Sequence, residues 1–547
     1  MLNNKNIKRL SIFFPLSILV ITGIAYGLVF RGFFQHDEWV MFGRYFLGKE
    51  NVISAFVPAV SHYVPLTRFF LYLYFLVFQL NFSWYACLSI LGHLAVVFLA
   101  FIFFSELLRS RVLGFLAGLL FAIGASGHQA TSWVGTDIAT HSSVIFGLLS
   151  LIFILNFQKI WPSVICLIIS LLFKEATIAF FVLLPLTIYL FDRKNYLKSQ
   201  LNYLKIPLVG FFYFLFRLSM VFFPRFYIKE QLVSETQSFS DIFVNLITFP
   251  AKIYAQALIP IGLLLNLARQ FTKILPVQIT GLYGTTAFDN FLENITLQVI
   301  NWVIFILSFI LLAYVVRKTK DRTIKNTAIF GFIFAIVNSF IYVLSPGRPG
   351  SIPVVDSRNV YLPSLGIAVF LISAVYILAK GKIVKIILII FPLVFLNIFW
   401  LEKELKILAD RGTERKAILY QIKHSYSTLP KKVVFYMTSD TSFYGFPESE
   451  KIFPFEVNLG YTLIVWYQLQ EHFPPEFFDK TIFLDKLTDE GYKEIGGRGF
   501  GYFRNWGTLI HAIRDNQLEK DSIIAFAYNS RTKSVEDITS KIRAKIN

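Results

Sequence analysis

The chain has 547 residues, of which 55% are hydrophobic, and its apolar runs of about 17–25 residues match the thickness of a bilayer. This pattern excludes a soluble globular protein, and the runs lack the alternation of an outer-membrane barrel. The net charge of +18 follows the short loops, which excludes a nucleic-acid-binding face, and Cys87 and Cys166 are too few for a disulfide framework or a thiolate metal cluster. The sequence therefore predicts an all-α polytopic membrane protein.

The first apolar run, residues 10–30, follows the basic segment MLNNKNIKRL and lacks a small-residue cleavage site. We interpret it as an uncleaved span that starts in the cytoplasm. Residues 31–65 then form an extracytoplasmic loop that carries HDEW. Residues 66–80 are apolar but shorter than the roughly 20 residues of a span, so we expect an in-plane outer helix. A crossing there would place the later basic loops outside.

Ten further spans are predicted along the chain. They are 84–104, 112–125, 138–157, 160–174, 176–191, 204–223, 297–316, 326–345, 360–378 and 384–401. Residues 242–265 are broken by Pro250 and Pro260, and we expect a second in-plane segment there. Eleven crossings leave the C-terminus outside. The predicted cytoplasmic segments then hold 18 Lys/Arg and 3 Asp/Glu, as the positive-inside rule requires.

The composition changes after residue 401, so we divide the chain into a transmembrane domain, 1–401, and a C-terminal extracytoplasmic α/β domain, 402–547. The second domain has 21 basic and 20 acidic residues. After a helical linker it contains strand-like runs at 431–437, 481–487 and 522–528 and a helical stretch at 535–546. The glycine-rich stretch 496–507 lacks the lysine of a P-loop, and we expect a flexible loop.

Four groups of polar residues fall on the predicted outer face. They are Asp37 and Glu38; His128 and Asp137; Lys174 and Glu175; and Arg348, Asp356 and Arg358. Ionisable groups near hydrocarbon are costly and usually line a cavity or a pathway. The sequence therefore predicts one polar cavity roofed by the outer loops.

Each group also has a simpler interpretation. Asp37 and Glu38 can be solvated loop carboxylates, and His128 can be a packing or capping residue. Lys174 and Glu175 are adjacent and cannot face one target, so one of them is structural. A divalent metal held by His36, Asp37, Asp137 and His141 is the one cofactor considered, but these residues lack a characteristic ligand spacing.

Four stretches in this order resemble a known superfamily. They are HYVPLTRF (62–69), HQATSWVGTDIATHSSVIFGLLSLIF (128–153), LLFKEATIAFFVLLPL (171–186) and SRNVYLPSLG (357–366). Together with HDEW after the first span, they resemble the GT-C membrane glycosyltransferases. The likeness is closest to the protein O-mannosyltransferase branch of the transmembrane-and-tetratricopeptide type, without the repeats. Val64, Gln129 and Thr136 depart from the family pattern.

The resemblance implies transfer of a sugar from a polyprenyl-phosphate donor to an acceptor hydroxyl on the outer face, with inversion. Asp37 stands at the position of the general base, with Glu38 beside it. Arg358 is the first candidate to bind the donor phosphate, and Lys174 and Arg348 come next. The cavity is expected to include His128, Asp137, Glu175 and Tyr361.

Other functions stay open at this point. One is a polysaccharide polymerase or ligase, and another is a non-enzymatic transporter of lipid or glycan. The expected partners are the lipid-linked donor, membrane lipids and a protein, lipid or glycan acceptor, with no nucleic acid. We expect a bacterial inner membrane, with the N-terminus in the cytoplasm and the C-terminal domain outside.

Overall fold

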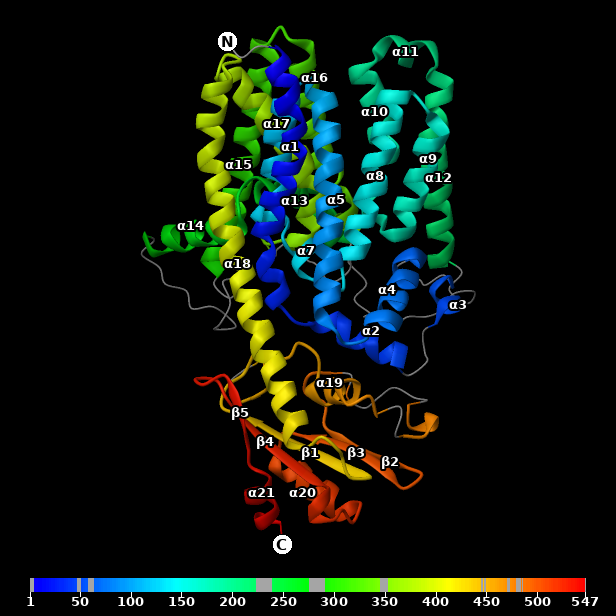
Figure 1. Cartoon of the computed structure of the whole chain (residues 1–547), viewed down its shortest axis with the longest axis vertical. Coiled ribbons are helices and arrows are strands. Elements are labelled where there is room, and N and C mark those ends of the chain that lie inside the picture. The colour runs from blue at the N-terminus through cyan, green and yellow to red at the C-terminus, as the bar shows by residue number, and fades with distance from the viewer. Residues whose placement is uncertain are drawn as a thin grey trace.

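The computed structural model contains a bundle of long helices and a small α/β domain, which the helix α18 (Ile383–Ser425) connects (Figure 1). The structure describes residues 4–46, 51–57, 63–222, 239–274, 291–344, 353–443, 446, 449–469, 473–478, 484 and 486–546.

Ten other helices form the long rods of the bundle. They are α1 (Asn4–Ala25), α5 (Phe82–Leu108), α6 (Arg111–Ala122), α8 (Asp137–Phe157), α9 (Ile160–Phe173), α10 (Phe180–Phe191), α12 (Gln200–Phe222), α15 (Phe291–Lys318), α16 (Arg322–Val337) and α17 (Ser357–Leu378). Within the described residues, seven helical segments are long and apolar enough to cross a membrane, or eight if one bent pair is counted. These seven coincide with the predicted spans at 10–30, 84–104, 138–157, 297–316, 326–345, 360–378 and 384–401.

Short elements connect the rods. They are η1 (Gly27–Arg31), α2 (His36–Phe46), α3 (Val52–Ala55), α4 (Pro65–Phe78), η2 (Ala125–Gly127), α7 (Gln129–Ser132), η3 (Glu175–Thr177), α11 (Arg193–Lys198) and η5 (Phe340–Leu344). The short helix α4 covers the end of α9, where Thr67 Oγ1 donates a hydrogen bond of 2.6 Å to the Phe173 carbonyl. In Figure 1 α4 lies beyond the ends of α8 and α9. The helix is 14 residues long, and its in-plane position stays a prediction.

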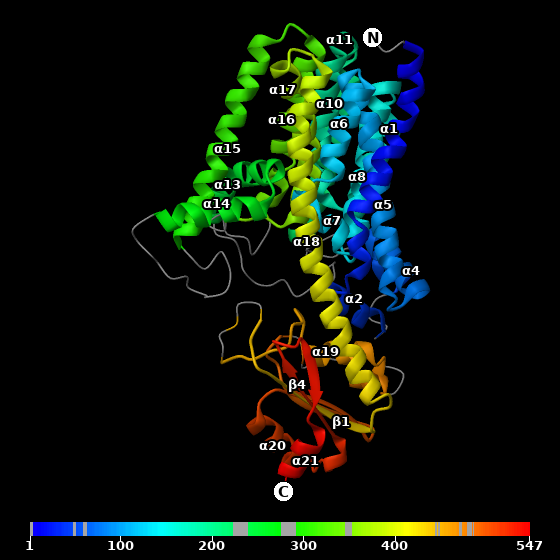
Figure 2. The same cartoon turned by 60° about the vertical axis from the view of Figure 1, so that its left-hand side comes forward.

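The bent pair consists of α13 (Phe239–Leu258) and α14 (Ile261–Ile274), which meet at an angle of 107°. The chain breaks at Pro260, but Pro250 lies inside α13, so the break predicted there is wrong. Buried side chains on both sides of Pro250 pack against η5, α15 and α17 and hold the helix together through the proline. Figure 2 shows α14 running sideways from the bundle.

The C-terminal domain is a five-stranded sheet in the order β2-β3-β1-β4-β5. Its strands are β1 (Lys432–Ser439), β2 (Gly491–Ile495), β3 (Arg498–Phe503), β4 (Ile523–Asn529) and β5 (Ser534–Asp537). The central strand β1 pairs in parallel with β3 and β4, and both edge pairs are antiparallel. The domain also contains α19 (Leu459–Trp466), η7 (Pro475–Phe477), α20 (Trp506–Asp515), η8 (Lys520–Ser522) and α21 (Thr539–Lys545).

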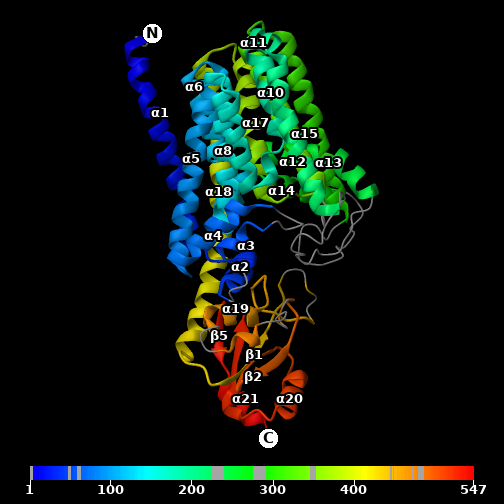
Figure 3. The same ribbon diagram turned by 90° about the vertical axis from the view of Figure 1, so that its right-hand side faces the viewer.

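The two faces of β1 belong to two different cores. Val433, Phe435 and Met437 join a large apolar cluster with α19, whereas Val434 and Tyr436 pack with α20 and α21. This alternation follows from the two-residue repeat of a strand. Figure 3 shows α19 on the side of the sheet that faces the bundle and α20 and α21 on the other side.

Two strand predictions are confirmed and one loop prediction is wrong. The runs at 431–437 and 522–528 become β1 and β4, whereas 481–487 lies mostly outside the described residues. The glycine-rich stretch is ordered as a tight turn followed by the interior strand β3. Gly496 and Gly497 have φ values of +61° and +74° and form the two-residue turn of a hairpin. The predicted helix at 535–546 splits into β5 and α21.

The C-terminal domain sits directly on the first loop of the chain. The helix α18 is 43 residues long and unbroken, so the proposed division at 401/402 falls inside it. The ring of Trp466 on α19 lies 6.1 Å from that of Phe33 and 6.3 Å from that of Trp39, between centroids. The core of the domain is therefore continuous with the apolar residues around α2.

Candidate functional site

Glu38, in the first turn of α2, is 1% exposed and accepts three hydrogen bonds. Its Oε1 accepts from the Gly135 amide at 3.1 Å, and its Oε2 accepts from Trp133 Nε1 at 3.1 Å and from the Gln35 amide at 3.2 Å. Three donors compensate the carboxylate for its loss of water. The interpretation of Glu38 as a solvated loop carboxylate is therefore wrong.

Three predicted residues cannot be placed. The side chains of His36 and Asp37 lie outside the described residues, although both belong to α2. Arg348 is outside as well.

The Trp133 indole connects Glu38 to Arg358. Its ring nitrogen donates to Glu38, and the Arg358 guanidinium lies over its face, with Cζ 4.4 Å from the ring centroid. Arg358 also forms an ion pair with Asp356, whose Oδ2 lies 3.6 Å from Nη2. The stacking fixes the guanidinium plane, and the side chain keeps a quarter of its surface exposed. Several of its N–H donors therefore remain for a ligand.

Lys174 brings a second cation to the same place. It lies in the extended connection between α9 and η3, and its Nζ donates to Thr140 Oγ1 at 3.0 Å. Burial, together with the nearby charge of Arg358, lowers the pKa of Lys174 to about 8, and the charges of Glu175 and Asp356 oppose this shift. We call Glu38, Trp133, Lys174 and Arg358 the domain-side cluster, because they lie at the end of the bundle that faces the sheet (Figure 1).

Glu175 has a different environment from Lys174. Its Oε1 lies 3.4 Å from Arg217 Nη2 and accepts a hydrogen bond of 3.1 Å from the Tyr63 amide. These contacts tie the first loop to η3 and α12. Glu175 therefore connects these elements to one another, and the binding of an anion by Lys174 stays a prediction.

Asp137 and His128 are both buried in the connection that leads from α6 to α8. Asp137 is 3% exposed, is near enough to Glu38 for the two charges to interact, and accepts from the Ile138 amide at 2.6 Å. His128 makes a local contact, with Nδ1 3.1 Å from Ser132 Oγ. Burial lowers the pKa of His128 to about 4. Its contact fits the packing interpretation.

Tyr361 lies one step deeper, in a layer of buried polar side chains. His93 Nε2 lies 2.9 Å from the Ala122 carbonyl and must donate to it, so Nδ1 accepts from the Tyr361 hydroxyl at 2.7 Å. His141 Nε2 lies 3.2 Å from Thr131 Oγ1. Sequence reasoning missed His93, although an ionisable residue inside the 27-residue apolar helix α5 is a signal for function.

The described side chains form no evident binding site for a divalent metal. No group of three or more His, Cys, Asp or Glu residues lies together in this part of the chain. The set of His36, Asp37, Asp137 and His141 is only half visible, since two of its side chains are outside. The metal site considered from the sequence therefore stays a prediction.

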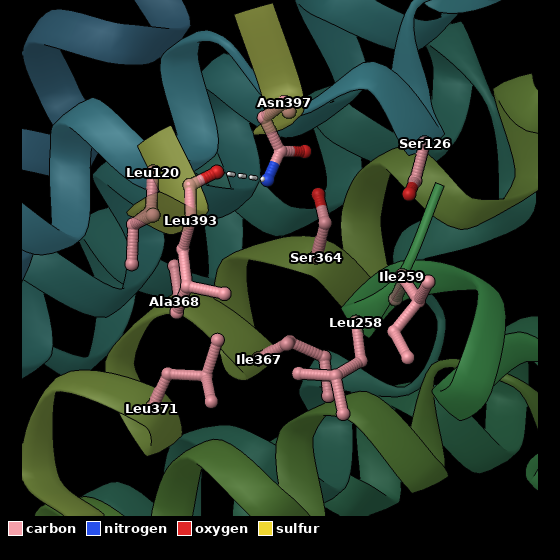
Figure 4. Close-up of a pocket in the computed structure, with 12 residues that line it drawn as sticks. Leu120, Ser126, Leu258, Ile259, Ser364, Ile367, Ala368, Leu371, Leu393 and Asn397 are labelled. Atoms are coloured by element: carbon pink, nitrogen blue, oxygen red, sulfur yellow. Dashed lines mark hydrogen bonds between the residues drawn. The ribbon is translucent and has the colours of Figure 1, made fainter. Parts of the chain in front are cut away.

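An apolar cavity of about 280 Å³ lies inside the bundle (Figure 4). Leu120, Ile367, Leu371 and Leu393 contribute to its wall, from α6, α17 and α18, and residues of α13 close it. Ser126 lines its polar end, and the Ser126 carbonyl accepts a hydrogen bond of 2.7 Å from Ser357 Oγ, next to Arg358.

No protein-family model matches the chain, and no curated protein matches it in sequence. The resemblance to the GT-C enzymes therefore rests on the four quoted stretches. The contacts of Tyr63 with Glu175 and of Thr67 with Phe173 join the first and third stretches, and the contact of Trp133 with Arg358 joins the second and fourth. The hydrogen bond from Lys174 to Thr140 joins the second and third stretches, so all four are connected.

Proposed function

We propose that the protein is a membrane glycosyltransferase, which moves a sugar from a polyprenyl-phosphate donor to an acceptor hydroxyl. The observation that carries this proposal is the domain-side cluster. The cluster contains two cations, Arg358 and Lys174, beside the first turn of α2. The Glu38 carboxylate anchors that turn, and Asp37 is the residue before it. The reaction has no nucleotide to bind, and the donor already carries its leaving group.

The acceptor oxygen attacks the anomeric carbon while the bond from that carbon to the phosphate oxygen breaks. Asp37 takes the hydroxyl proton, and polyprenyl phosphate leaves with the bonding electron pair. A single displacement inverts the anomeric configuration. The base must act where the headgroup meets water, because the carrier tail stays in the bilayer.

Glu38 acts as a positioning residue in this scheme. Both of its oxygens are occupied by donors from the first loop and from 133–135. This anchor fixes the first turn of α2 and with it the backbone of Asp37. Glu38 therefore orients the base and does not accept the proton.

Arg358 and Lys174 suit the leaving phosphate. Negative charge grows on the phosphate as the bond breaks, and fixed cations lower the energy of that state. The guanidinium matches phosphate oxygens in a fork, whereas the ammonium acts as a point charge. Their mutual repulsion, which contributes to the lowered pKa of Lys174, is relieved by an anion between them.

The apolar cavity supports a lipid-linked donor. Ser364, Ile367 and Leu371 of α17 line it and follow Arg358 along the same helix. At about 1.5 Å per residue, they extend roughly 9–20 Å from the cation. At 3.6 residues per turn these residues stand on the other side of α17 from Arg358, so an isoprenoid chain that starts at Arg358 reaches this apolar wall by passing around the helix.

The finer topology belongs to the same proposal. Eleven crossings place the N-terminus in the cytoplasm of a bacterial cell and the C-terminal domain outside. Besides the seven long apolar helices, α6, α9, α10 and α12 cross under this scheme, and α4 and α14 lie in the outer interface. The domain-side cluster then faces the extracytoplasmic side, where the acceptor is a protein, a lipid or a glycan.

The direct test follows release of polyprenyl phosphate by the full chain in lipid, with short-chain polyprenyl-phosphate sugars as donors. We expect release by the wild type, a loss of about 100-fold or more in Asp37→Asn, and at least about tenfold in Arg358→Ala. Exposed residues of α18 give matched controls, Asp410→Asn and Arg411→Ala. A parallel sample with EDTA reports on a metal.

Two results would count against the scheme. Full activity in Asp37→Asn would show that Asp37 is not the general base. Retention of the anomeric configuration would exclude a single displacement. Lengthening of a glycan acceptor would instead identify the polymerase or ligase reaction.

A transporter is the second candidate, and the break between α13 and α14 favours it. Broken helices line substrate paths in many transporters. Movement of labelled lipid-linked sugar across sealed vesicles, without release of polyprenyl phosphate, would support this candidate and contradict the enzyme.

A further inference from the structure

A second pocket, of about 500 Å³, lies at the end of the bundle away from the sheet. It lies between the end of α10 and the turn that joins α15 to α16, at the same end as α11 and the N-terminus (Figure 1). Four cations line it: Arg193, Lys320, Arg322 and Lys325. We call it the far-end pocket.

These four cations have only partial local compensation. Within the described part of the chain, none of them takes part in a salt bridge. The two acids next to them in sequence serve as helix caps, and their charges offset two of the four cations. Asp192 accepts from the Asn195 amide and from Gln158 Nε2, and Asp321 accepts from the amides of Thr323 and Ile324. The positive-inside rule explains cations in these loops, but not their arrangement around one hollow.

The walls of the pocket are held in place by contacts between α10 and α16. The rings of Phe191 and Phe330 lie 6.1 Å apart between centroids, and Asn326 Nδ2 donates to the Leu190 carbonyl. The Arg193 guanidinium lies 5.5 Å from the centroid of the Tyr189 ring. The cations are therefore gathered by the fold before any ligand arrives.

An apolar path leads from the pocket along the outside of α10. Val182, Leu186 and Tyr189 are spaced as i, i+4 and i+7 and share one face of the helix. Val182 is 57% exposed and Tyr189 is 40% exposed. In a spanning helix such a face contacts acyl chains, so the pocket lies where a headgroup ends and its chains begin.

We propose that the far-end pocket binds the phosphate of an anionic phospholipid. The phosphate offsets the repulsion between the four cations, and the acyl chains follow the exposed face of α10. Each basic residue near an anionic membrane surface contributes about 1 kcal/mol to such binding. The site is independent of the proposed glycosyl transfer and lies at the opposite end of the bundle.

The test uses the detergent-purified full chain and native mass spectrometry with phosphatidylglycerol, phosphatidylcholine or inorganic phosphate. The variant Lys320→Gln/Arg322→Gln/Lys325→Gln removes three pocket cations. The control Lys380→Gln/Lys382→Gln/Lys385→Gln removes the same charge from the exposed turn between α17 and α18. We expect phosphatidylglycerol to bind the wild type and the control equally and the pocket variant at least tenfold more weakly.

Three outcomes would overturn the proposal. Equal losses in both triple variants mean that only bulk charge attracts the lipid. Equal binding of phosphatidylglycerol and phosphatidylcholine means that the net negative charge of the headgroup is not recognised. Binding of inorganic phosphate as tight as that of phosphatidylglycerol means that the occupant is a soluble anion.

Discussion

The two ends of the helical bundle carry charge in opposite ways. At the domain side, Glu38 is buried with three donors, and Arg358 is stacked and paired. At the far end, Arg193, Lys320 and Arg322 are exposed around a hollow. A buried charge must be fully hydrogen-bonded to be tolerated, whereas an exposed one is free for a ligand. The first arrangement holds the charged groups in fixed positions, and the second leaves them open to solvent.

The strongest test of this difference is Glu38→Gln. The amide offers one oxygen to three donors, so at least one of them loses its acceptor, at about 1–3 kcal/mol each. We expect a lower melting temperature and a loss of turnover of about 100-fold, because small displacements near a reacting centre are costly. Glu402→Gln, on the exposed face of α18, is the control. If the variant has the same melting temperature and turnover as the control, Glu38 does not anchor α2.

The pH dependence comes next, and it rests on Lys174. With its pKa lowered to about 8, the cation is present below that pH and lost above it. We expect donor turnover to fall roughly tenfold per pH unit on the alkaline side. In Lys174→Arg the charge persists, and the alkaline limb moves to higher pH. If the alkaline side of the pH profile does not move in this variant, a group other than Lys174 causes the loss of turnover.

The same shift has a consequence for stability, with the opposite sign. The unfolded lysine has a pKa near 10.5 and binds its proton more tightly than the folded one. Between about pH 8 and 10.5 this group therefore makes the folded state more stable as the pH rises. Differential scanning calorimetry of wild type and Lys174→Arg separates this contribution from other titrations.

A smaller effect is expected at the contact between α2 and α19. A methyl group on Gly43 would overlap the Tyr461 hydroxyl, and overpacking of this kind costs about 1–3 kcal/mol. Gly23→Ala, in α1, is the matched control, because no atom lies within 4 Å of the added carbon. Limited proteolysis of the C-terminal domain should quicken in Gly43→Ala only. Equal proteolysis of the two variants would argue against a close fit.

The smallest effect is expected at the far end. Without lipid, the triple glutamine variant of the far-end pocket should keep its free energy of unfolding within about 0.5 kcal/mol of wild type, as exposed substitutions usually do. Thermal melts in detergent measure this. A loss as large as that of Glu38→Gln would mean that the two ends are built alike.

Seven long apolar helices could be predicted from the sequence because long apolar runs are a local property. The partners of Glu38 could not, since the Gly135 amide lies 97 residues away and nothing in HDEW reveals it. Glycine has a low strand propensity, so β3 looked like a loop until its neighbours were known. Pro250 looked like a helix break from the local sequence alone, whereas tertiary packing holds the helix together through the proline.

The contact between α2 and α19 joins Val40 to Tyr461, 421 residues further along the chain. A ribosome that adds about 5–20 residues per second needs roughly 20–80 seconds to cover that interval. Throughout this time the aromatic side chains around Trp39 lack the surface of α19 that covers them in the folded protein. The first loop of the chain is therefore among the last parts of the protein to mature, and its assembly depends on completion of the C-terminal domain.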